Sequence, residues 1–179
     1  SATGVTGTPG TLTVNGSGLA SGTTGALSVV SGQLILTVTT TGYTVTFDAN
    51  GGTGSMSNQT ASTATALTAN AYTRTGYAFS GWNTAANGSG TSYTNGQSYP
   101  FTANATLYAQ WTPNNNTITF DGNGFTGGST SSQTLATAAT AALNTNGYTR
   151  TGYTFSGWAT TAGGAVAYAD GASYTMGTA

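Results

Sequence analysis

A repeated set of sequence blocks constrains this chain more than any other feature. The segment YTVTFDANG at 43–51 returns as NTITFDGNG at 116–124, and YTRTGYAFSGW at 72–82 returns as YTRTGYTFSGW at 148–158. A third block, YTNGQSY, returns as YADGASY seventy-five residues later. Three blocks in the same order at a nearly constant offset predict two copies of one small folding unit.

The residues inside these blocks alternate between apolar and polar. Val45 and Phe47 point one way along a strand while their threonine neighbours point the other, which is typical of a half-buried β-strand. The Asp-Ala-Asn-Gly and Asp-Gly-Asn-Gly segments that follow tolerate positive φ and predict turns. The stretches 62–70 and 136–144 fit either a strand or a short helix. A last alternating stretch, ATLYAQW at 105–111, ends before Pro113, which favours a module boundary there.

The two ends of the chain differ from the repeats. Residues 1–41 hold strand-like runs broken by glycines, and about 40 such residues are too few to bury a core alone. The second copy stops at YTMGTA, without a counterpart of LYAQW at 107–111. We therefore expect an N-terminal arm at 1–41, a first module at 42–113 and a second module at 114–179 that is incomplete at its C-terminal edge.

Composition excludes most chemistry. Only 3% of the 179 residues are charged, and there is no Lys, Glu, His or Cys. The chain therefore lacks most transition-metal ligands and has neither His nor Lys to activate a hydroxyl nucleophile, so we expect no enzyme activity, no metal site and no cofactor. Two arginines are too few for a nucleic-acid footprint, and no apolar run is long enough to span a membrane.

The repeated blocks together with the LYAQW ending closely resemble the internalin-type B repeat, also called the Listeria/Bacteroides repeat. The resemblance covers 43–112 in full and 116–179 without its last strand. It implies a small β-grasp-like module, strung in tandem on bacterial cell-surface proteins and without a catalytic role. The expected fold is mainly β, with two tandem β-grasp-like modules after a strand-rich arm.

Repeat register predicts the core and one polar pair of each module. The expected core of the first copy is Val45, Phe47, Tyr77, Phe79 and Trp82, and that of the second is Ile118, Phe120, Tyr153, Phe155 and Trp158. Each copy also keeps one acid and one arginine, namely Asp48 with Arg74 and Asp121 with Arg150. These residues fit a structural ion pair, or a turn in which the Asp carboxylate accepts backbone N–H groups.

The edges of this chain carry almost no charge to guard them against pairing with another strand. We therefore expect an extracellular structural subunit or segment of a bacterial filament or surface fibre, in which the arm of one copy completes the open module of the next. The donor candidates are Leu12, Val14, Leu34, Leu36 and Val38. Two alternatives stay open: a fragment of a longer tandem array, and an adhesin stalk that binds a host receptor or glycan.

Overall fold

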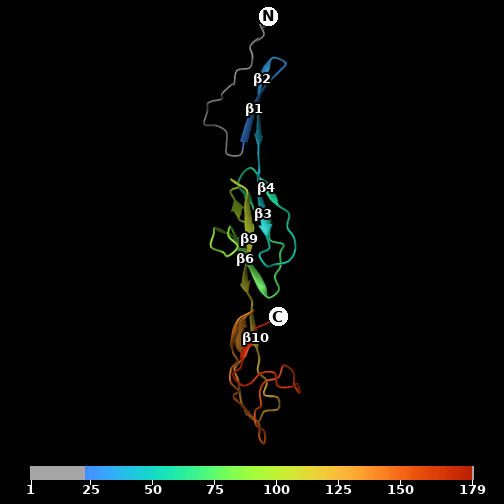
Figure 1. Cartoon of the computed structure of the whole chain (residues 1–179), viewed down its shortest axis with the longest axis vertical. Helices are drawn as coiled ribbons and strands as arrows, with labels where there is room; N and C mark the ends of the chain where they lie inside the picture. Colours follow the sequence, from blue (N-terminus) through green and yellow to red (C-terminus); the bar gives the residue numbers. More distant parts are fainter. Residues whose placement is uncertain (1–22, 179) are drawn as a thin grey trace. The chain divides into compact units, whose positions relative to one another are not determined.

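The computed structural model describes residues 23–178 and consists there of strands, turns and loops without a helix (Figure 1). The expectation of a mainly β fold is confirmed, whereas the β-grasp topology stays a prediction. The stretches 62–70 and 136–144, which fitted a strand or a helix, contain strand residues. No helix that could cross a membrane occurs in this part of the chain.

The strands are short except for the first two and the ninth. In chain order they are β1 (Thr23–Val30), β2 (Gln33–Thr40), β3 (Tyr43–Asp48), β4 (Gln59–Ala61), β5 (Thr65–Ala66), β6 (Tyr77–Asn83), β7 (Ser92–Tyr93), β8 (Ser98–Tyr99), β9 (Ala105–Pro113), β10 (Asn115–Ile118), β11 (Gly127–Gly128), β12 (Gln133–Ala136), β13 (Thr140–Ala142), β14 (Tyr148–Thr149) and β15 (Ser173–Thr175).

The described residues form two compact units whose limits do not follow the repeat boundaries. The first unit holds 23–50 together with Ser55–Ala71 and Gly81–Ala109. The second holds the remaining described residues, including the segment Tyr72–Ser80 of the first repeat. The sequence repeat is therefore not identical with a compact unit.

Strands β1 and β2 form a hairpin at the start of the described chain. They pair antiparallel over all eight residues of each strand, from Thr23 opposite Thr40 to Val30 opposite Gln33. The turn between them places Ser31 and Gly32 at positive φ. Such a turn matches the twist of a tight two-residue hairpin.

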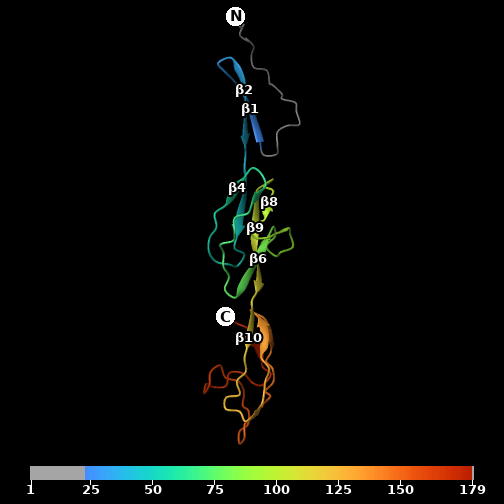
Figure 2. The ribbon, with the colours of Figure 1, turned by 180° about the vertical axis from the view of Figure 1, so that it is seen from behind.

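The first repeat builds a five-stranded sheet in the order β4-β3-β9-β6-β7. Figure 2 labels β4, β9 and β6 of this sheet. Strand β9 is central in it and runs parallel to β3, with Val45 opposite Ala105 and Phe47 opposite Leu107. A parallel neighbour requires a long connection, and here 56 residues separate the end of β3 at Asp48 from the start of β9 at Ala105. The sheet therefore closes only when the last strand of the repeat is in place.

The core of the first repeat lies under this central strand. Val45, Trp82, Leu107 and Ala109 have no exposed surface, and Phe101 is almost fully buried. Phe47 packs on Trp82 with ring centroids 4.8 Å apart. Tyr77 and Phe79, which the alternation placed in the core, are only half-buried.

The second repeat starts in the same way but builds only two-stranded pairs: β10 with β12, β11 with β14, and β13 with β15. The pairing of β10 with β12, for example Ile118 opposite Gln133, repeats that of β3 with β4, where Val45 lies opposite Gln59. Residues 153–159, which correspond to β6, contain a single isolated bridge, between Trp158 and Tyr168. No strand of the described second repeat corresponds to β9 or β6.

Candidate functional site: an open groove in the second repeat

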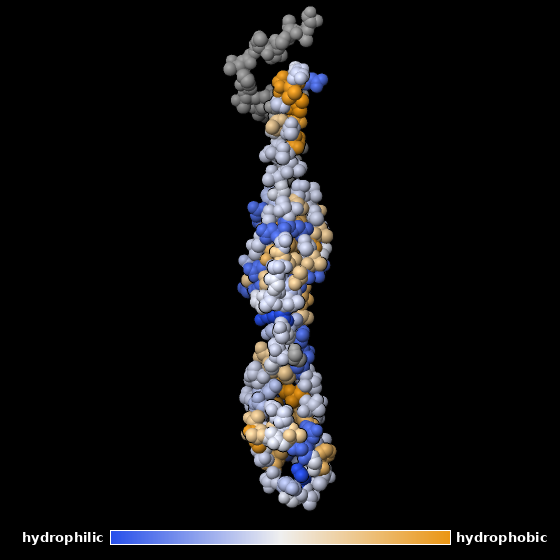
Figure 3. Space-filling view, turned by 90° about the vertical axis from the view of Figure 1, so that its right-hand side faces the viewer, coloured by the Kyte–Doolittle hydropathy of each residue, from blue (hydrophilic) through white to orange (hydrophobic). Residues whose placement is uncertain are grey.

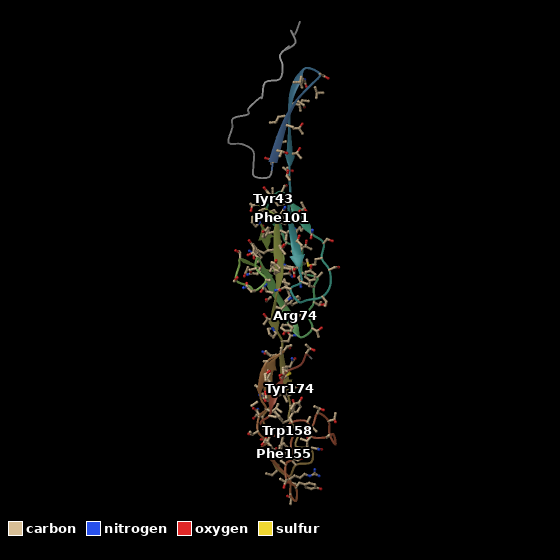
Figure 4. The ribbon with its side chains drawn as sticks, viewed as in Figure 1. Tyr43, Arg74, Phe101, Phe155, Trp158 and Tyr174 are labelled. Atoms are coloured by element: carbon tan, nitrogen blue, oxygen red, sulfur yellow. The ribbon has the colours of Figure 1, made fainter. Side chains whose placement is uncertain are left out.

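The second repeat keeps the central aromatic pair of the first. Phe120 and Trp158 lie with ring centroids 4.7 Å apart, as their counterparts Phe47 and Trp82 do. Leu143 joins them in a small buried cluster, with Tyr148 and Tyr174 packed against it. Figure 4 labels Trp158, Phe155 and Tyr174 in this part of the molecule. The second repeat thus has the aromatic floor of the module but lacks the five-stranded sheet of the first repeat.

A groove of about 900 Å³ lies beside this aromatic pair. Its lining includes Ile118 and Phe120, whose counterparts in β3 pair with β9, and also Phe155, Gly157 and Trp158, whose counterparts lie in β6. In the first repeat β9 lies between β3 and β6. The groove therefore occupies the place that the central strand fills in the first repeat.

The main chain at the groove has free hydrogen-bonding groups. Among the described residues, no hydrogen bond reaches the backbone of Thr119 or Asp121, nor that of Thr154–Gly157. The carbonyl of Phe120 is the exception, because the Tyr148 hydroxyl donates to it at 2.8 Å. A row of unpaired backbone groups beside an apolar surface is what an additional β-strand requires.

The aromatic side chains at the rim are not core residues. Tyr153 is 68% exposed and Phe155 is 40% exposed, so the expectation that both are buried is wrong. The first repeat shows the reason for Phe155: its counterpart Phe79 packs edge-on against Trp111 of β9 at 5.6 Å, and the described second repeat has no residue in the place of Trp111. Ile118 is half-buried, and Phe120 and Trp158 are buried.

The acid and the arginine of each repeat do not form the expected ion pairs. The carboxylates of Asp48 and Asp121 each accept the backbone N–H two residues later at 2.7 Å, and so fix a turn. The guanidinium of Arg74 lies over the ring of Tyr77 at 4.0 Å, and that of Arg150 lies over the ring of Tyr153 at 4.1 Å.

Arg150 also donates to the carbonyl of Asn123 at 3.2 Å. The structural ion-pair assignment of Asp48, Arg74, Asp121 and Arg150 is therefore wrong, and the turn-fixing alternative describes both acids. A short carboxylate with a nearby backbone donor satisfies itself locally, whereas arginine gains more from an aromatic face.

An asparagine ties the turn after β3 to the central strand. In the first repeat the Asn50 side-chain amide donates to the carbonyl of Ala109 in β9 at 2.8 Å, and also to the carbonyl of Ala86 at 2.8 Å. The counterpart is Asn123, which has the same positive φ. No hydrogen bond from the Asn123 side-chain amide exists within the described part of the chain. This donor is thus available at the groove.

The loop beyond the groove is also less constrained in the second repeat. In the first repeat Asn83 is buried and makes five hydrogen bonds to the loop that follows, through both its amide nitrogen and its oxygen. Its counterpart is Ala159, which can make none of them. Asn83 was not singled out from the sequence. The available signal was that this polar residue is replaced by Ala159 in the second copy.

Other polar contacts recur in both repeats and were also missed. The Gln59 side chain donates to Ala66 and accepts from Thr68, and the Gln133 side chain donates to Ala142 and accepts from Asn144. These bonds fix the stretches of chain that precede Tyr72 and Tyr148. A glutamine at the same place in both copies was the signal.

The donor candidates fall into two groups. Leu36 and Val38 lie in β2 and are 51% and 47% exposed, and Figure 3 shows the hydrophobic colour gathered over this hairpin. Leu34 also belongs to β2. Leu12 and Val14 lie outside the described residues. The whole hairpin carries no charged residue.

The chemistry of the site is limited to apolar contact and hydrogen bonding. Among the described side chains, no group of three or more His, Cys, Asp or Glu could hold a metal ion. Asp121 and Arg150 are the charged residues in the groove lining. In the first repeat, burial and then the neighbouring Tyr93 raise the pKa of Tyr99 above its ordinary value.

Comparison with known proteins gives one match. A family model described as "Flg_new: Listeria-Bacteroides repeat domain (List_Bact_rpt)" matches residues 43–110 and 117–179. The two segments correspond to the two expected copies and to the family that the sequence blocks resemble, which confirms that expectation. Neither the curated proteins nor the solved structures give a match.

Proposed function

The chain belongs to the Listeria-Bacteroides repeat domain family, and from this premise we propose that it is a structural segment of an extracellular bacterial filament or cell-surface fibre. Domains of this family often occur in surface proteins, which supports the location. The proposal gives the two repeats a mechanical role and assigns them no catalytic step.

One observation carries the proposal: the groove of the second repeat has the shape and chemistry of a vacant strand position. Phe120 and Trp158 form its apolar floor, and the backbone of Thr119 and Asp121 offers unpaired groups along its side. A strand added there completes the sheet as β9 does in the first repeat. Addition of a strand through main-chain hydrogen bonds is a recurrent mode of protein association.

The cost of leaving the groove open favours occupation. Full burial of an aromatic or large aliphatic side chain contributes about 1.5–3 kcal/mol. Phe155 and Tyr153 are both exposed at this rim, whereas Phe79, the counterpart of Phe155 in the first repeat, packs on Trp111 of β9. If each copy both supplies and accepts a strand, the contacts run head to tail, and a filament grows where the rotation between copies does not close into a ring.

The rim of the groove also favours a second candidate, an adhesin that binds a glycan. Exposed aromatic rings beside polar groups, here Phe155 with Asp121 and Asn146, suit a sugar face. Tyr153 contributes less to this hypothesis, because Arg150 already covers one face of its ring, as Arg74 covers the ring of Tyr77 in the first repeat.

Electron microscopy of the purified 179-residue chain tests the proposal. We expect regular fibres whose axial repeat corresponds to one chain, at micromolar concentration and without added ligand. Single particles of uniform size over the same concentration range contradict the fibre. Single particles that are retained on a glycan array and released by the free sugar support the adhesin instead.

A further inference from the structure

The structure separates the two groups of donor candidates. Strand β2 is already paired with β1 over its full length of eight residues, so its entry into the groove as a central strand requires the hairpin to open. A central strand must be free on both edges, because β9 has β3 on one side and β6 on the other. The hairpin is therefore a poor donor.

The other candidate segment carries apolar residues at the two positions of β9 that face the core. Residues 11–15 read TLTVN, and residues 106–110 in β9 read TLYAQ. The alignment places Leu12 at the position of Leu107 and Val14 at the position of Ala109, the two residues of β9 that are fully buried. It places an amide, Asn15, at the position of Gln110.

The groove offers a specific partner to each part of this segment. In the first repeat Leu107 lies opposite Phe47, so Leu12 would lie opposite Phe120 on the apolar floor. Asn50 donates to the carbonyl of Ala109, so Asn123 would donate to the carbonyl of Val14. Val14 is larger than Ala109, and a groove of about 900 Å³ has room for the added methyl groups.

We propose that residues 11–15 of a second copy of this chain lie in the groove of the second repeat, parallel to residues 118–121, with Leu12 opposite Phe120. The inference rests on the proposed function and names the partner of its groove. Seven residues join Asn15 to β1 and reach about 25 Å when extended. Insertion of residues 11–15 into the groove of their own chain would require β1 to lie within about 25 Å of that groove. Insertion into the groove of a second copy does not depend on that distance.

Two introduced cysteines test this register, because the chain has no cysteine of its own. In the first repeat Thr106 lies opposite Thr46, so the corresponding pair is Thr11 and Thr119. The double variant Thr11→Cys/Thr119→Cys places the two sulfurs on one face of neighbouring strands, within the Cα separation that a disulfide needs. Under mild oxidation we expect a ladder of covalent oligomers that a reductant collapses to one band.

The matched control is Thr13→Cys/Thr119→Cys, which is two residues out of register. Its Cα atoms would be about 8 Å apart, beyond the reach of a disulfide, so we expect at most a tenth of the ladder. Equal ladders from both variants overturn the register. A cross-linked monomer without a ladder overturns the second copy and shows that the chain fills its own groove.

A charge at the buried position tests the same contact without oxidation. The variant Leu12→Asp should lose the fibre fraction in sedimentation, whereas Thr11→Asp, on the opposite face of the strand, should keep at least half of it. Fibres that persist in Leu12→Asp, together with no ladder from the cysteine pair, overturn the inference and leave the fibre proposal standing. Absence of fibres in the unmodified chain contradicts both.

Discussion

Phe47 lies directly opposite Leu107 in a parallel strand pair, and Phe120, the counterpart of Phe47, lies at an open groove. This one relationship accounts for the main differences between the two repeats. With Leu107 and its strand in place, the first repeat has a five-stranded sheet and a core with residues of zero exposure. Without them, the same aromatic floor has only two-stranded pairs around it.

The buried asparagine of the first repeat gives a first prediction. Asn83→Ala removes five hydrogen bonds to the following loop and leaves backbone groups there without partners. We expect the free energy of unfolding of the first repeat to fall by about 2–4 kcal/mol. Urea unfolding followed by tryptophan fluorescence measures it. Asn87→Ala, at an exposed residue of the same loop, should change it by less than about 1 kcal/mol.

A glycine in β6 gives a second prediction. Gly81 has φ of 145°, and a Cβ added there would lie 2.9 Å from the carbonyl oxygen of Tyr93 in the neighbouring strand. We expect Gly81→Ala to lower the free energy of unfolding by about 1–3 kcal/mol, because both backbone strain and a clash oppose it. Gly177→Ala has open space and serves as the control. Equal thermal midpoints for the two variants would count against the close approach of β6 and β7.

The raised pKa of Tyr99 gives a third prediction. Burial and then Tyr93 raise this pKa in the folded state above the ordinary value of about 10. The folded state therefore holds the Tyr99 proton more tightly than the unfolded state does. The resulting stability is fully present below about pH 10 and is lost as the pH rises through the folded pKa.

Denaturant unfolding between about pH 9 and pH 12 checks this sign. We expect the midpoint of the first repeat to decrease with pH, and the decrease to be smaller in Tyr99→Phe, which has no ionisable group at that position. An identical slope in Tyr99→Phe and in the unmodified chain would show that Tyr99 does not contribute. A midpoint that rises with pH would show that the sign is wrong.

The repeat blocks were sufficient to predict the mainly β fold, the two copies and the aromatic pair at the centre of each. They failed where a contact depends on a residue outside the block. Phe155 and Phe79 lie in the same Tyr-x-Phe-Ser-Gly-Trp pattern, and alternation alone treats them alike. Their surroundings differ because Trp111 packs on Phe79, whereas Phe155 packs on Trp158 of its own block at 4.9 Å and no residue of the described second repeat takes the place of Trp111.

Polar residues were harder to predict for a related reason. Asp121 and Arg150 are an acid and a base that recur at equivalent positions of both copies, which suggests an ion pair. The Asp carboxylate instead has a backbone donor two residues away, and the arginine has the ring of Tyr153 three residues away. Which of these short-range partners a side chain takes is set by the local turn, and the spacing of charges does not reveal it.

The central claim is that the groove of the second repeat is a vacant position for a strand like β9. Tyr174, Thr175 and Met176 correspond to Tyr99, Pro100 and Phe101, so Ala179 corresponds to Asn104, the residue before β9. A variant in which the sequence ATLYAQW of residues 105–111 follows Ala179 therefore supplies the missing strand in register. A second variant with Asp in place of the leucine of that added segment is its control.

Sedimentation velocity of the two extended variants beside the 179-residue chain is the most direct test. We predict that the unmodified chain and the Asp control sediment as polymers, whereas the chain with the added ATLYAQW sediments as a single copy because its groove is filled. Polymers of the same size in all three samples would contradict the claim that this groove holds the fibre together.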